Sequence, residues 1–161
     1  MRVLKHFIAA MALVLTVGAQ AHTAHAGDKA LVQTFYDFLS NPTSKTLSQK
    51  MRAVLADDWK SVGDYSGSAK TREKFIGQIN GFGKLIPNMK WRVEEMLQAG
   101  NRVIVRGRAS GTPKGPLFGV DGGGKSFEIM SIDIHTVEGG KIVHTYHVED
   151  WAGALRQLRQ K

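Results

Sequence analysis

Asp133 and His147 are the residues of this chain whose types and expected positions best suit proton transfer. They lie in segments 126–136 and 142–149, where alternating side chains predict an antiparallel hairpin joined by a three-residue loop at 138–140. In that register the two residues are diagonal neighbours, with backbones about 7–8 Å apart, so their side chains can meet. Because a carboxylate that orients an imidazole is the arrangement of a general base, His147 is predicted to carry a proton and Asp133 to orient it.

The length of the hairpin loop decides whether this pair exists. The three-residue loop gathers five polar residues on one face of the hairpin: Ser131, Asp133, His135, Thr145 and His147. A two-residue loop would instead pair His135 with His144 and separate Asp133 from His147.

The hydrophobic pattern alone favours the opposite orientation of this hairpin. The other face carries Met130, Ile132, Ile134, Ile142, Tyr146 and Val148. If that apolar face packs on the core, the polar face lies in solvent and Asp133 and His147 form a weak surface pair.

Several other kinds of site are not indicated. The chain has no cysteine, which excludes disulfides and thiolate sites, and it has no G-x-S-x-G motif. Residues 119–126 fit the phosphate-loop pattern, but the segment after them alternates as a strand, whereas that loop must open a helix. His144 and His147 lie three apart on a strand and so point to opposite faces, where they cannot share a metal. We predict no cofactor and no metal.

The composition is that of one ordinary globular domain. The chain has 161 residues, 42% of them hydrophobic and 22% charged, with 22 Lys and Arg against 14 Asp and Glu. The basic residues after the first 26 are scattered, in runs of no more than two and with few aromatic residues among them. We therefore interpret the positive charge as solvating the surface and expect no nucleic-acid partner.

The first 26 residues have the three parts of a signal peptide. Arg2 and Lys5 precede an apolar run at 7–17, and Ala24-His25-Ala26 forms a small-x-small cleavage site. The run has 11 residues against the roughly 20 that span a bilayer, so the mature chain is expected to have no membrane span. The sequence thus predicts a signal peptide at 1–26, cleaved near Ala26, and a single domain at 27–161 that is exported to the periplasm or secreted.

The order of the predicted elements indicates an α+β fold. Apolar periodicity predicts three helices and then four antiparallel strands before a short amphipathic tail at 152–158. The helices are expected at 29–40, from Ser44 to near 57–59, and at 71–82; the strands at 89–97, 102–109, 126–136 and 142–149. The segments 61–68 and 111–124, both rich in small residues, are expected to be loops.

Several short motifs keep a recognisable order in this chain. They are I-P-N-M-K-W at 86–91, G-N-R-V at 100–103, the glycine-rich loop 115–125, G-K-I-V at 140–143, and Asp150 followed by a helix. In this order the chain resembles the SnoaL-like polyketide cyclases and their ester cyclase relatives, within the nuclear-transport-factor-2-like superfamily. The resemblance covers about residues 29–158.

The resemblance implies a fold and an activity. The fold would be a cone, with N-terminal helices packed on a curved antiparallel sheet around an apolar pocket, often as a homodimer. The family cyclases use an Asp on the last strand as acid and base for an aldol ring closure without a cofactor. His147 occupies that position here. We expect Tyr36, Trp59, His135 and Thr145 to contact a small hydrophobic ligand.

Two functions from different classes follow from this interpretation. In the first, the exported protein carries out cofactor-free acid and base chemistry on a small hydrophobic carbonyl compound, with His147 and Asp133 as catalytic residues. In the second, it binds a small hydrophobic ligand or a protein partner without turnover. Dependence of activity on His147 distinguishes the two.

Overall fold

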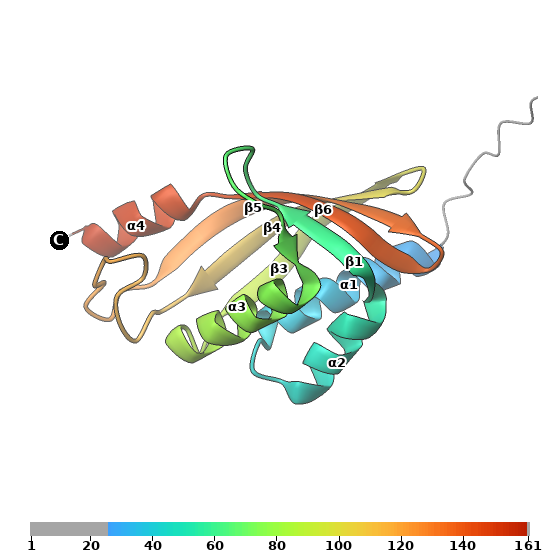
Figure 1. Ribbon diagram of the computed structural model, residues 1–161. Coiled ribbons are helices and arrows are strands. Elements are labelled where there is room, and N and C mark those ends of the chain that lie inside the picture. The colour runs from blue at the N-terminus through green and yellow to red at the C-terminus, as the bar shows by residue number, and fades with distance from the viewer. Residues whose placement is uncertain (1–25, 161) are drawn as a thin grey trace, which may run out of the picture.

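The computed structural model describes residues 26–160, and it shows three helices lying against one side of a curved sheet (Figure 1). The sheet has six strands in the order β2-β1-β6-β5-β4-β3, antiparallel except for the parallel pair β1 and β6. A fourth helix, α4, follows the last strand. The elements are α1 (Ala26–Ser40), α2 (Lys45–Val54), β1 (Leu55–Val62), β2 (Lys70–Thr71), α3 (Arg72–Leu85), β3 (Lys90–Ala99), β4 (Arg102–Gly111), β5 (Phe127–Glu138), β6 (Lys141–Glu149) and α4 (Trp151–Arg159).

The α+β fold class is confirmed, and so are the predicted helices and the four predicted strands, with shifts of a few residues at their ends. Ser44 caps α2 as expected, since its hydroxyl accepts a hydrogen bond from the Leu47 amide at 3.2 Å. Asp150 caps α4 in the same way, through the Gly153 amide at 2.7 Å.

The strands β1 and β2 were not predicted. The local pattern predicts that the second helix continues to residues 57–59 and that a loop follows at 61–68, whereas α2 ends at Val54 and β1 follows at once. The segment carries Asp57 and Asp58, and because aspartate is depleted in strands, the local sequence does not indicate a strand there. The strand with which β1 pairs, β6, is far away in the sequence. The sheet is therefore mixed rather than wholly antiparallel.

The broad apolar face predicted for the first helix packs under the sheet. It buries Val32, Phe35, Tyr36, Phe38 and Leu39. At the end of α1, the Ser40 hydroxyl accepts a hydrogen bond from the Trp91 amide at 2.9 Å and donates to the Trp91 carbonyl at 2.8 Å. This double hydrogen bond ties α1 to β3 and fixes the helix across the sheet.

The register of the β5–β6 hairpin differs from both registers considered from the sequence. Glu138 pairs with Lys141, so the turn has two residues, Gly139 and Gly140, both with positive φ. A bulge in β6 then adds one residue, and beyond it His135 pairs with Thr145 and Asp133 with His147. The expected diagonal arrangement is thus wrong in detail, because Asp133 and His147 lie directly opposite each other. Because of the bulge, Ile142 is buried, although simple alternation puts it on the same face as Tyr146 and Val148, which the structure exposes.

The polar face of this hairpin lies inside the molecule. Ser131, Asp133, His135 and Thr145 are buried, whereas the opposite face exposes Met130, Ile132, Tyr146 and Val148. The orientation favoured by the hydrophobic pattern alone is therefore wrong. The apolar residues that sequence analysis would assign to a core lie on the outer surface of the sheet, and the inner polar groups are satisfied by hydrogen bonds to one another.

The predicted signal peptide lies almost entirely outside the described residues, which begin at Ala26, the first residue of α1. Within residues 26–160, no helix is long and apolar enough to cross a membrane.

Candidate functional site

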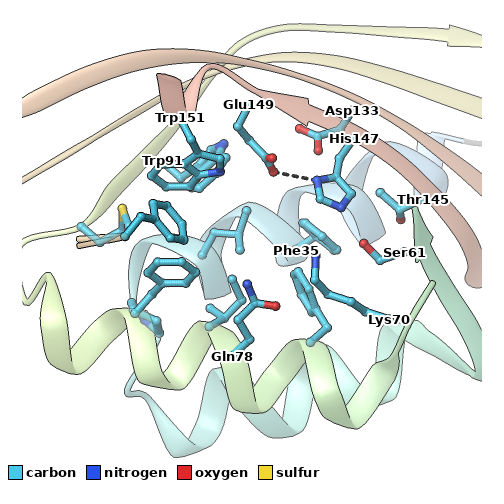
Figure 2. Close-up of a pocket in the computed structure, with 17 residues that line it drawn as sticks. Phe35, Ser61, Lys70, Gln78, Trp91, Asp133, Thr145, His147, Glu149 and Trp151 are labelled. Carbon is cyan, nitrogen blue, oxygen red and sulfur yellow. Dashed lines mark hydrogen bonds and ion pairs between the residues drawn. The ribbon is translucent and has the colours of Figure 1, made fainter. Parts of the chain in front are cut away.

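A pocket lies between the sheet and the helices α1 and α3 (Figure 2). The space within it, including the part that is open to solvent, is about 720 Å³. Most of its wall is apolar, and the polar groups that face it come mainly from β1, β2, β5 and β6. The lining residues are Phe35, Leu39, Pro42, Ser61, Lys70, Phe75, Gln78, Ile79, Phe82, Met89, Trp91, Phe118, Asp133, Thr145, His147, Glu149 and Trp151.

His147 is held in the pocket through one of its two ring nitrogens. Nδ1 lies 2.8 Å from Oε1 of Glu149, whereas Nε2 is buried and has no hydrogen-bond partner among the described residues. Since an ionised carboxylate can only accept, Nδ1 carries the proton of the neutral ring and Nε2 has a free lone pair. Gly63 makes room for this ring, because a Cβ there would lie 2.9 Å from Cε1. The arrangement leaves His147 able to take a proton at Nε2.

Asp133 is the second ionisable group in the wall of the pocket, and it is almost fully buried. Burial raises the pKa of its carboxyl from 3.8 to about 7, while hydrogen bonds from Tyr36 and Ser131 act in the opposite direction. The Tyr36 hydroxyl donates to Oδ2 at 2.8 Å, and the Ser131 hydroxyl lies 3.4 Å from the same atom. A carboxyl group with this pKa can hold or release a proton near neutral pH.

Asp133 was expected to orient His147, but in the structure Glu149 does so. The hydrogen bond to the imidazole comes from Glu149, although the nearest ionisable atoms of all three residues lie within 4.8 Å of one another. Glu149 was missed in the sequence analysis. It follows His147 by two residues on β6, so the period of the strand could have placed both on one face.

A chain of buried hydrogen bonds runs behind the pocket wall to Asp133. Trp59 Nε1 donates to Thr145 Oγ1 at 3.1 Å, Thr145 Oγ1 lies 3.0 Å from His135 Nδ1, and His135 Nε2 lies 3.1 Å from the Tyr36 hydroxyl. Burial lowers the pKa of His135 to about 3, so its ring is neutral near pH 7. Because the Tyr36 proton goes to Asp133, His135 donates from Nε2 and accepts from Thr145 at Nδ1. This series of hydrogen bonds thus fixes the Tyr36 hydroxyl as a donor to the Asp133 carboxylate.

The structure divides the predicted ligand contacts into two groups. Thr145 lines the pocket, as do the predicted catalytic residues Asp133 and His147. Tyr36, Trp59 and His135 lie in the buried layer behind the wall and are not among the lining residues. We therefore assign these three to positioning of Asp133 and Thr145 rather than to ligand contact.

Aromatic side chains form the opposite end of the pocket. Phe82 and Trp151 stack with ring centroids 5.7 Å apart and an angle of 2° between the rings, and Phe118 packs edge-on against both. Phe118 belongs to the glycine-rich loop, so that loop forms part of the pocket wall. The segment after the loop is the strand β5, which confirms that it is not a phosphate loop.

Asp133, His147 and Glu149 are also the residues that could hold a metal ion within residues 26–160. Two oxygens and one imidazole nitrogen suit a divalent cation. However, the hydrogen bond from Nδ1 to Glu149 already pairs two of the three groups, and Tyr36 and Ser131 occupy Oδ2 of Asp133. That the protein needs no metal stays a prediction.

Two further polar residues in the pocket escaped the sequence analysis. Ser61 lies on β1 and Lys70 on β2, in the segment that was expected to be helix end and loop. Once β1 is recognised, its period places Trp59 and Ser61 on the same inner face, which is the signal that could have found Ser61.

Comparison with known proteins agrees with this architecture. The family model for SnoaL-like polyketide cyclases matches residues 30–158. Similar solved structures include a candidate SnoaL-like polyketide cyclase from Jannaschia sp. CCS1, with a TM-score of 0.72 and 18% identity over 84% of this chain and 93% of that one. IdmH, a candidate polyketide cyclase from Streptomyces antibioticus, has a TM-score of 0.71 and 24% identity over 83% of this chain and 99% of that one.

A protein from Catenulispora acidiphila with a ketosteroid isomerase-like fold has a TM-score of 0.63 and 19% identity over 81% of this chain and 93% of that one. At these identities the structures support the fold alone. The comparison with curated proteins gave no match. Since the family model spans most of the chain and the fold agrees with it, this protein belongs to the SnoaL-like polyketide cyclase family.

Proposed function

We propose that the pocket carries out cofactor-free proton transfer on a small, largely apolar carbonyl compound. His147 takes a proton from the carbon next to the carbonyl group. The C–H bond breaks, an N–H bond forms at Nε2, and the electron pair moves through the carbonyl group onto its oxygen to give an enolate. The enolate then either attacks a second carbonyl group of the same molecule, which closes a ring, or takes the proton back at another atom, which gives an isomer.

The observation that carries this proposal is the state of the His147 imidazole. Nδ1 is bound to Glu149, Nε2 has no hydrogen-bond partner within residues 26–160, and the ring lines a mostly apolar pocket. When Nε2 takes a proton, the imidazolium that forms lies 2.8 Å from the Glu149 carboxylate, which stabilises it. Glu149 is therefore a positioning residue in this account.

Asp133 supplies a second proton-transfer group on the same wall. Because the pKa of its carboxyl is about 7, both of its protonation states are populated near neutral pH. Asp133 lies directly opposite His147 across the hairpin. It is placed to give a proton to the product while His147 holds the one it removed.

The pocket wall suggests the kind of molecule that would bind. Aromatic and aliphatic side chains dominate its α3 and α4 side, whereas Ser61, Lys70, Thr145 and His147 gather at the sheet side (Figure 2). Such a site favours a flat, apolar molecule with an oxygen function at one end.

Exchange of hydrogen for deuterium next to a ketone tests this proposal without knowledge of the natural substrate. The probe is 2-tetralone in deuterated buffer, followed by proton NMR. We expect the folded protein to increase the exchange rate above the buffer rate, with saturation as the ketone concentration rises. The same protein treated with EDTA is expected to keep its rate. No exchange above buffer, despite measurable binding of the ketone, would favour the alternative function, a ligand-binding protein without turnover.

We propose in addition that the protein is exported. The proposal rests on residues 1–26, which have a basic start, an apolar run and a small-x-small cleavage site. Mass spectrometry of the protein from a periplasmic or culture fraction is expected to find Gly27 as the first residue. Recovery of only the uncleaved chain from the cytoplasmic fraction would contradict the proposal.

We further propose that the chain forms a homodimer through the outer face of β5 and β6. Met130 and Val148 are 57% and 67% exposed there, and Ile132 lies opposite Val148 in the next strand. An exposed apolar patch of this kind is typical of an interaction surface. Analytical ultracentrifugation is expected to give twice the mass of the chain, and Val148→Glu is expected to reduce it to one. A monomer in the unmodified protein would exclude the dimer.

A further inference from the structure

Lys70, Ser61 and Thr145 form a row across three adjacent strands of the sheet. Ser61 pairs with Lys70 of β2 on one side and with Thr145 of β6 on the other. Residues paired across strands point to the same face, and all three line the pocket. Figure 2 shows Lys70 reaching into the pocket on the side of Ser61, Thr145 and His147.

Two buried polar atoms at this end of the pocket have no partner. They are Ser61 Oγ and His147 Nε2, and they are the unpartnered buried side-chain atoms among the described residues. Figure 2 shows Nε2 on the edge of the imidazole that faces Ser61. A buried polar group without a partner destabilises a fold, so two such atoms on residues that line one pocket indicate a ligand group that binds both.

The chemistry of the row is that of hydrogen-bond donors. The Lys70 ammonium carries three donor protons, and none of the ion pairs in residues 26–160 includes it. The Ser61 hydroxyl has a donor proton without an acceptor, whereas the Thr145 hydroxyl proton is used by His135. A positive charge and a free hydroxyl beside each other suit an oxygen that is negatively charged or becomes so.

The row is separated from the carboxylates of the pocket. His147 lies on β6 between β1, which carries Ser61, and β5, which carries Asp133. An anionic oxygen at Ser61 and Lys70 is thus placed across the imidazole from Asp133. Its neighbouring carbon would face Nε2 of His147.

We propose that Ser61 and Lys70 bind the ionisable oxygen of the ligand, and that this ligand is an enolisable ketone or a phenol-like compound. The inference rests on the proposed function for the role of that oxygen: as His147 removes the α-proton, the charge that moves onto the carbonyl oxygen is stabilised by the Lys70 ammonium and the Ser61 hydroxyl. The two residues then lower the energy of the enolate more than that of the bound ketone, which is what accelerates the step.

Binding of 4-nitrophenol tests the oxygen site directly, because its ionised form has its own absorbance band. We expect the protein to bind the ionised form at least tenfold more tightly than the neutral form, which lowers the apparent pKa of the bound probe by one unit or more. Lys70→Met and Ser61→Ala are each expected to remove most of this preference. Lys60→Met is the matched control, since Lys60 is exposed and belongs to the neighbouring pair of the same two strands.

The variants are suited to this test because the fold does not depend on either side chain. Ser61 Oγ has no hydrogen-bond partner in the part of the chain that the structure describes, and Lys70 is only partly buried, so both variants are expected to keep the far-UV circular dichroism of the unmodified protein. An equal preference for the ionised probe in the two variants and in Lys60→Met would overturn the inference.

The outcome can be separated from that of the proposed function. Loss of phenolate preference in Lys70→Met and Ser61→Ala, in a protein that does not exchange the protons of 2-tetralone, would support the oxygen site and contradict the enzymatic role. Proton exchange that persists unchanged in both variants would support the role of His147 and overturn the assignment of Ser61 and Lys70.

Discussion

Replacement of His147 by glutamine is expected to lower the rate of proton exchange in 2-tetralone by about 10²–10⁴-fold, the usual contribution of a general base. Glutamine can still donate a hydrogen bond to Glu149, so the pocket keeps its shape, but its amide cannot take a proton at neutral pH. The measurement is the exchange rate at saturating ketone, followed by proton NMR in deuterated buffer.

His144→Gln is the matched control for this experiment. His144 lies on the same strand, is not among the pocket-lining residues, and packs against Tyr146. Its replacement is expected to leave the exchange rate within about twofold of the unmodified protein. Similar losses in the two variants would show that the effect comes from the strand rather than from the His147 imidazole.

Single replacements of Asp133 and His135 are expected to change the pH dependence of stability in opposite directions. The pKa of Asp133 is raised to about 7 in the folded protein, so between about pH 4 and 7 the folded state holds a proton that the unfolded state has lost. Its contribution to the free energy of unfolding therefore falls as the pH rises, by at most about 1.4 kcal/mol per pH unit.

His135 makes the opposite contribution. Its pKa is lowered to about 3, so between about pH 3 and 6.5 the unfolded state holds the extra proton. Stability from His135 thus rises with pH over this window and is lost as the pH falls. In the unmodified protein the two slopes largely cancel between about pH 4 and 6.5.

Each variant removes one of the two groups, so it shows the pH dependence of the free energy of unfolding that the other group causes. Relative to the unmodified protein, Asp133→Asn is expected to gain stability as the pH rises from 4 to 7, and His135→Gln to lose it as the pH rises from 3 to 6.5. Urea unfolding at several pH values gives both differences. Parallel pH profiles for all three proteins would mean that neither group is perturbed by burial.

Much of the fold could be predicted from local patterns, and its failures have physical causes. The apolar face of α1 and the alternation in β3 to β6 are local signals, and they gave the helices and strands. The strand β1 carries Asp57 and Asp58 and pairs with β6 from a distant part of the chain, so no local pattern indicates it. The pocket could be predicted from the resemblance to the family but not from the periodicity of the hydrophobic residues.

The candidate site could be predicted only in part, for similar reasons. The predicted three-residue loop put Asp133 and His147 on one face, and this part of the prediction is confirmed, although the structure reaches it through a two-residue turn followed by a bulge. The bulge in β6 set their actual pairing, and a bulge has no strong sequence signal here. The inner face of β5 places Ser131, Asp133 and His135 among buried side chains, which a hydrophobic pattern assigns to solvent. Only their mutual hydrogen bonds make that burial favourable.

The proposed role of His147 depends on a free Nε2 in the pocket, which requires that Glu149 hold the proton at Nδ1. Two-bond proton–nitrogen NMR correlation on ¹⁵N-histidine-labelled protein, at a pH where the ring is neutral, measures this directly. We predict a protonated Nδ1 and an unprotonated Nε2 for His147, with this preference lost in Glu149→Leu. A neutral ring protonated at Nε2 in the unmodified protein would contradict this assignment, because Nε2 would then have no lone pair to take a proton from a ligand.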